Sequence, residues 1–94
     1  MLKETKNCPV EFSVDYDGNM EDLDLGGNDI TEDEIETLIK KVIDSGELIL
    51  GERSTGLIEI FSNKIVFDYQ YCEDVGEDWD SDVWVEEKFD IPNE

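Results

Sequence analysis

The chain carries 27 aspartates and glutamates against seven lysines and arginines, which gives a formal net charge of −20 at pH 7. Two like charges about 10 Å apart in water repel each other by roughly 0.4 kcal/mol before salt screens them. Added over the many pairs of a compact domain, this repulsion reaches several kcal/mol, on the order of the whole folding free energy of about 5–15 kcal/mol. The fold must therefore spread its carboxylates over the surface while it buries enough apolar side chains to be stable.

Length and composition favour one small globular unit. The 94 residues suffice for one domain and leave no room for two, so residues 1–94 are expected to form a single domain. Hydrophobic residues make up 38% of the chain, but no apolar run approaches the length of a membrane span and no signal sequence is visible. We expect a cytoplasmic protein without membrane contact, and the sequence leaves open whether Cys8 and Cys72 pair.

Alternating apolar and polar residues predict a hairpin near the start of the chain. After a loose segment over residues 1–8, the apolar residues occupy every second position from Val10 to Tyr16. Asp17 and the glycine that follows it form a strong turn pair, and a second alternation over residues 22–25 supplies the returning strand.

One amphipathic helix is predicted over residues 32–45. Thr31 and Glu34 have the spacing of a capping box, acids crowd the first turn, and Gly46 supplies the stop. The apolar residues recur at positions i, i+3, i+4, i+7 and i+8, which is the stripe of a single buried helix face. They are Ile35, Leu38, Ile39, Val42 and Ile43.

Four further strands are predicted after the helix, over residues 48–50, 57–61, 64–72 and 83–91, with a turn-prone stretch over residues 51–56. The predicted fold class is therefore α+β. It consists of an antiparallel sheet of about six strands in the order ββαββββ, with the amphipathic helix packed on one face.

The acids are segregated from the bases along the chain. Eleven acids and no base lie from Asn7 to Ile39, and nine acids and no base lie from Ile65 to Glu87. The densest stretch is 73–82, with six acids in ten residues. Alternate residues on a strand project about 6.7 Å apart, and helix neighbours lie about 5–6 Å apart. These intervals are similar to the spacing of phosphates along one nucleic-acid strand, so a rigid acidic surface can stand in for a polynucleotide in a basic groove.

A small, very acidic α+β chain with such tracts resembles the DNA mimics and related anti-defence inhibitors that phages make, including anti-CRISPR and anti-restriction proteins. The resemblance rests on size, net charge and the two tracts. It implies a non-catalytic inhibitor that occludes the groove of a basic nucleic-acid-binding protein, such as a CRISPR effector, a restriction enzyme or a nuclease, without binding nucleic acid itself. An immunity protein that neutralises a basic nuclease toxin would need the same kind of acidic surface and stays an alternative.

The predicted contact surface combines the acidic loop with acids of the first hairpin and of the helix. Trp79 lies inside the loop and is expected to anchor the interface, as aromatic residues in charged surfaces do. Trp84 stands between two valines on a predicted strand and is expected to turn inward against the core. The predicted contact residues are Glu73, Asp74, Glu77, Asp78, Trp79, Asp80 and Asp82 in the loop, Asp15, Asp17, Glu21, Asp22 and Asp24 in the hairpin, and Asp33 and Glu36 on the helix.

Catalysis and specific metal binding have little support in the sequence. The chain has no histidine, no nucleophile with a partner base, no phosphate-binding loop and no cofactor motif, so we expect neither an enzyme nor a cofactor. Residues 13–24 partly match a calcium loop, but Ser13 and Asp24 replace the usual Asp and Glu, and residues 78–82 lack the glycine of such loops. A small calcium-binding module, and a subunit that associates through an apolar surface, for example as a homodimer, are the alternatives.

Overall fold

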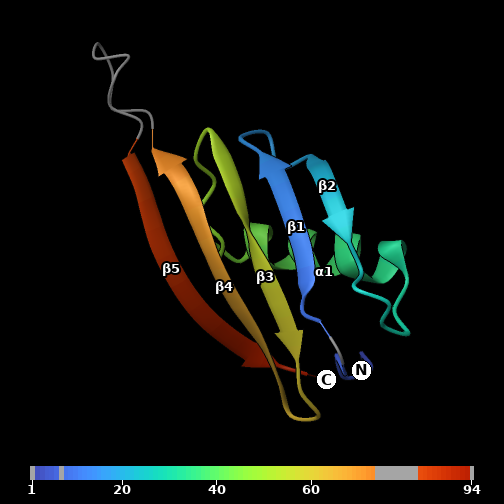
Figure 1. The fold of residues 1–94 in the computed structure, drawn as a ribbon. Coiled ribbons are helices and arrows are strands. Elements are labelled where there is room, and N and C mark those ends of the chain that lie inside the picture. Colours follow the sequence, from blue (N-terminus) through green and yellow to red (C-terminus); the bar gives the residue numbers. More distant parts are fainter. Residues whose placement is uncertain (1, 7, 74–82, 94) are drawn as a thin grey trace.

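Five strands and one helix make up the part of the chain that the computed structural model describes, residues 2–6, 8–73 and 83–93 (Figure 1). In chain order they are β1 (Val10–Asp15), β2 (Met20–Asp24), α1 (Glu32–Asp44), β3 (Arg53–Ile60), β4 (Lys64–Glu73) and β5 (Val83–Pro92). The strands form one antiparallel sheet in the order β2-β1-β3-β4-β5, so β2 and β5 are its edges. The predicted α+β class is confirmed.

The molecule has two layers, because α1 packs across one face of the sheet (Figure 1). Successive side chains of a strand point to opposite faces, so every second residue can meet the helix. The buried residues of α1 are Ile35, Leu38, Ile39 and Val42, and those that they join on the central strands are Val10, Phe12, Val14, Ile58, Ile60, Ile65, Phe67 and Tyr69. The other face of the sheet is covered by no element of the described chain.

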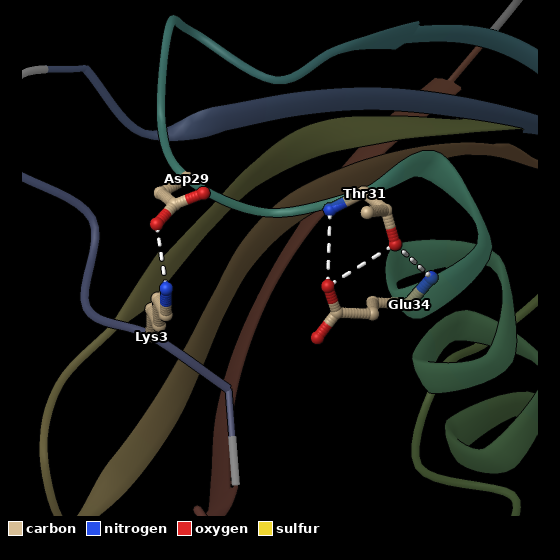
Figure 2. Close-up of polar contacts among 4 residues, drawn as sticks. All are labelled: Lys3, Asp29, Thr31 and Glu34. Carbon is tan, nitrogen blue, oxygen red and sulfur yellow. Dashed lines mark hydrogen bonds and ion pairs between the residues drawn. The ribbon is translucent and has the colours of Figure 1, made fainter.

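The start of α1 follows the predicted capping box (Figure 2). The Thr31 hydroxyl accepts the N–H of Glu34 at 3.2 Å, and the Glu34 carboxylate accepts the N–H of Thr31 at 3.1 Å. Two backbone donors that the helix leaves unpaired are thereby satisfied. Ile30 and Ile35 are both buried beside this turn, and Gly46 ends the helix with a φ of +83°. The predicted helix is confirmed.

Aromatic rings fill the middle of the core on the helix side of the sheet. Phe67 on β4 meets Phe12 on β1 edge to face, with ring centroids 6.2 Å apart. It also stacks on Phe89 of β5 at 4.7 Å. Aromatic pairs of this kind stabilise a fold by more than the free energy gained from burying their surface. Through these two contacts Phe67 links the central strand β1 to the edge strand β5.

The sheet has five strands where six were predicted, since residues 48–50 form no strand. Leu48 is buried, the N–H of Ile49 donates to the Tyr69 hydroxyl at 2.9 Å, and the Ile49 carbonyl accepts the Ser54 hydroxyl at 2.9 Å. Side chains thus satisfy backbone groups that a strand would pair with a neighbour. The stretch 51–56, predicted as a turn, instead contains the beginning of β3.

Gly56 explains why residues 51–56 resemble a turn in the sequence although they contain the start of β3. A Cβ at this position would overlap the backbone of Tyr69 on the neighbouring strand, so the glycine marks a close approach of two strands and not a turn.

Two aromatic side chains within the predicted strands are exposed. Trp84 is 45% exposed, because its strand position places it opposite Cys72, on the face away from α1. Tyr16 is 68% exposed, because β1 ends at Asp15 and the chain turns there.

The first residues lie against the end of the chain. The N–H of Leu2 donates to the side-chain oxygen of Asn93 at 2.9 Å, and the Asn93 amide donates back to the Leu2 carbonyl at 2.9 Å. The N–H of Thr5 donates to the carbonyl of Ile60 at 3.0 Å. Both termini therefore lie at the same end of the sheet (Figure 1).

Candidate functional site

The acidic loop that was predicted to make the main contact lies outside the described residues. This applies to Asp74, Glu77, Asp78, Trp79, Asp80 and Asp82; of Glu73 the structure describes only the backbone, at the end of β4. The candidate site is therefore built from the hairpin, the helix and the sheet.

Three of the five hairpin acids have structural roles of their own. One Asp15 oxygen accepts the N–H groups of Asp17 and Asn19, at 3.0 and 2.9 Å, which shapes the turn between β1 and β2. Asp24 accepts the N–H of Gly26 at 2.9 Å, and Glu21 pairs with Arg53 at 3.1 Å. Asp17 and Asp22 are exposed, and their carboxylates have no hydrogen-bond or ion-pair partner among the described residues.

The two predicted helix acids lie on a different side of the molecule from the strand acids. Asp33 is exposed on α1, and Glu36 is half-buried there. Since α1 covers one face of the sheet, these side chains are separated by the sheet from acids that point to the other face. The structure therefore does not bring the hairpin and helix candidates together in one surface.

We define the open face as the side of the sheet away from α1. Strand register aligns its side chains in rows, with neighbouring strands about 4.8 Å apart. One row runs Asp24, Glu11, Leu57, Asp68 and Lys88 from β2 to β5, and the next runs Asp22, Ser13, Thr55, Gln70 and Glu86. Further acids of this face in the described strands are Asp15, Glu59 and Asp90, and its bases are Arg53, Lys64 and Lys88.

A shallow hollow of about 430 Å³ lies at the centre of the open face, between these two rows. Leu57 is 36% exposed and supplies an apolar floor. In its row, Leu57 stands directly between Glu11 and Asp68. The other side chains that reach the hollow from this face are Thr55, Gln70 and Glu86.

The carboxylates around the hollow form no close ion pair within the described residues, although Asp68 stands directly opposite Lys88. Within the described residues, Glu11, Asp68 and Glu86 make no side-chain hydrogen bond and no ion pair. Glu11 also stands directly opposite Asp24, and like charges in that position destabilise a sheet. Contacts within the fold therefore do not account for Glu11 and Glu86, whereas Asp68 faces a base across β4 and β5.

One ion pair and one buried hydroxyl, both away from the open face, have shifted pKa values. A 2.6 Å ion pair joins Lys3 to Asp29 on the exposed segment before α1 (Figure 2), and it lowers the pKa of Asp29 and raises the pKa of Lys3. Burial raises the pKa of the Tyr69 hydroxyl above its usual range, and the charge of Glu87 adds to this shift.

Sequence reasoning missed Glu11, Glu59, Asp68, Glu86 and Asp90. The alternation along each strand showed that these residues oppose the apolar side chains, but it did not show which strands are neighbours. Because β1 pairs with β3, residues from distant parts of the sequence share one row.

Neither a cluster of metal ligands nor a helix that could span a membrane is found among the described residues. Residues 2–6, 8–73 and 83–93 contain no group of three or more potential metal ligands. Ser13, at the first position of the calcium-like segment 13–24, lies inside β1 and is buried, and strands rather than helices flank the turn. Over the same residues no helix has the length and hydropathy to cross a bilayer.

The chain matches no protein-family model, no curated protein and no solved structure. The fold and the distribution of charge are therefore the observations that bear on function.

Proposed function

We propose that the protein is a non-catalytic inhibitor that binds a basic nucleic-acid-binding protein and blocks its nucleic-acid groove by charge mimicry. The observation that supports this most is the arrangement of acids on a rigid sheet. In the described part of the chain, carboxylates from all five strands share the open face with Arg53, Lys64 and Lys88, and Arg53 is already paired with Glu21.

The geometry of a sheet suits this role. Alternate residues on one strand lie about 6.7 Å apart, and neighbouring strands lie about 4.8 Å apart, so the carboxylates form a fixed grid. A groove that binds phosphates with lysines and arginines recognises charge at such intervals. Because the grid is already rigid, binding does not incur the entropy cost of ordering it.

The proposed setting is the cytoplasm of a cell whose defence proteins handle nucleic acid. A CRISPR effector or a restriction enzyme presents the required basic groove, so a phage anti-defence role fits the charge. A basic nuclease toxin presents the same chemistry, and an immunity protein against such a toxin is the alternative target within the same mechanism.

A capture experiment followed by competition tests the proposal. The affinity-tagged protein is incubated with a host-cell lysate at low salt, and bound proteins are eluted with a salt gradient. We expect elution of a basic nucleic-acid-binding protein that, once purified, loses its DNA or RNA when this protein is added. Retention of acidic proteins only, or of none even at low salt, would contradict the proposal.

A further inference from the structure

The acids of the described chain fall into two groups, those with a structural role and those without one. Asp15 and Asp24 bind backbone N–H groups of turns, Glu34 completes the capping box, and Glu21 and Asp29 form ion pairs. Acids in the first turn of α1 also interact favourably with the helix dipole. The fold itself therefore accounts for much of the acidity of the hairpin and of the helix start.

The acids around the hollow of the open face belong to the second group. Glu11, Asp68 and Glu86 have no hydrogen-bond or ion-pair partner within the described residues. They come from three strands, β1, β4 and β5, so only the assembled sheet brings them together. Lys88, directly opposite Asp68, offsets part of this negative charge, and the remainder is available to a cationic group from another molecule.

The hollow is also concave and has an apolar floor. A surface that attracted its partner by charge alone would need neither feature. Leu57 is 36% exposed between Glu11 and Asp68, each on a strand directly beside its own. A side chain that lies on Leu57 has a carboxylate about one strand spacing away on either side, roughly 5 Å. Arginine fits this arrangement, because its methylene stem packs on apolar surface while its planar guanidinium offers five N–H donors to carboxylates.

We propose that the open face is the docking surface for the basic partner and that the central hollow receives an arginine side chain of that partner. The inference rests on the proposed function and adds the surface and the anchoring residue. The stem of the arginine lies on Leu57, and its guanidinium donates to Glu11, Asp68 or Glu86.

Peptide binding to the intact chain tests this surface. The probe is a fluorescein-labelled nona-arginine peptide, and its affinity is measured by fluorescence anisotropy in about 0.15 M sodium chloride, where the Debye length is about 8 Å. The first variant combines Glu11→Gln, Asp68→Asn and Glu86→Gln, which removes three charges from the hollow. The matched control combines Glu4→Gln, Asp44→Asn and Glu47→Gln, which removes three charges from exposed positions outside the open face.

A variant that fills the hollow without changing the net charge tests the effect of the hollow's shape on binding separately from the effect of its carboxylates. Gln70→Trp fills the hollow from its own strand and leaves the net charge at −20. We expect binding to weaken about tenfold in the hollow variant and by a similar factor in Gln70→Trp, because the charge-assisted hydrogen bonds are lost or blocked. The control variant should weaken binding less than about twofold, because exposed charges at a distance are screened. Nona-lysine should bind the wild-type chain more weakly than nona-arginine does.

Chemical-shift mapping gives a measurement that needs no variant. On addition of nona-arginine to the ¹⁵N-labelled protein, the amide signals of Leu57 and Gln70 should move, and those of Leu38 and Ile39 in the buried side of α1 should not. Equal loss of affinity in the hollow and control variants, or shifts confined to α1, would overturn the inference.

Failure of this inference differs from failure of the proposed function. If the lysate experiment recovers a groove-blocked nucleic-acid-binding protein but the hollow variant still blocks it fully, the docking surface is wrong and the function stands. If nona-arginine binds as expected but no nucleic-acid-binding protein is captured, the function is wrong and the cationic docking surface stands.

Discussion

Gly56 lies in the middle of β3, where the neighbouring strand leaves no room for a side chain. A Cβ there would overlap the backbone of Tyr69, so Gly56→Ala must push β3 and β4 apart. We expect the free energy of unfolding to fall by more than about 1 kcal/mol, because local repacking cannot relieve an overlap with backbone. Urea unfolding followed by circular dichroism measures this loss.

The control for Gly56→Ala is Glu59→Ala, an exposed position on the same strand. Its effect should stay within about 0.5 kcal/mol, as is usual for surface substitutions. Equal stability of the two variants would show that the strands can separate at Gly56 without loss.

Tyr69 makes the stability of the protein sensitive to high pH. Burial raises the pKa of its hydroxyl above the usual value of 10.0, so folding favours the neutral form. The contribution of this hydroxyl is fully present below the unfolded pKa and is lost as the pH rises through the folded pKa. We expect the urea midpoint of the wild type to fall between about pH 8 and about pH 11 by more than that of Tyr69→Phe. Parallel curves for the two proteins would exclude this role for Tyr69.

At the scale of one element, α1 depends on its first turn. Thr31→Ala removes the hydroxyl that accepts the N–H of Glu34, and we expect a loss of about 1 kcal/mol in the free energy of unfolding. Thr37→Ala makes the same chemical change at an exposed position inside the helix, where alanine has the higher helix propensity, so it should stabilise slightly. Thermal melts of the two variants should therefore move in opposite directions, and a common direction would contradict the capping role.

The sequence predicted elements well where local chemistry determines them. The capping box, the apolar stripe and Gly46 are local signals, and the helix that they predict is present. Prediction failed where the decisive contact is distant in the chain. Ile49 binds Tyr69, and Gly56 is required by a neighbouring strand, so residues 48–50 and 51–56 were assigned wrongly.

The open face could not be predicted from the sequence for the same reason, because it depends on contacts between strands that are distant in the chain. Each open-face acid has the right alternation in its own strand, but Glu11 and Asp68 join one row only because β3 lies between β1 and β4. No local pattern encodes that strand order. The density of acids along the chain therefore predicted a contact surface at the loop 73–82 and did not reveal the acids that the sheet brings together.

At the scale of the whole molecule, calcium separates the proposed role from the alternative of a calcium-binding module. A specific calcium site would raise the melting temperature already at low calcium concentration, because binding to the folded state alone stabilises it by an amount that grows with the calcium concentration. We expect calcium chloride to stabilise the protein no more than sodium chloride of about the same ionic strength, apart from the modest extra effect of a divalent ion. A large shift at micromolar calcium would favour the alternative.

The net charge of −20 makes salt act in opposite directions on folding and on binding. Between about 0.01 M and about 1 M sodium chloride the Debye length falls from roughly 30 Å to roughly 3 Å, so repulsion among the carboxylates is screened. We expect the melting temperature to rise by several degrees over this range, which corresponds to about 1 kcal/mol in a domain of this size. The affinity for nona-arginine should fall steeply over the same range, because screening weakens attraction between opposite charges as much as repulsion between like ones. The hollow variant, with three fewer charges, should gain less from salt in its melting temperature. A melting temperature that does not change with salt would mean that the carboxylates do not strain the fold, and affinity that persists at 1 M salt would mean that the partner is held by apolar contact.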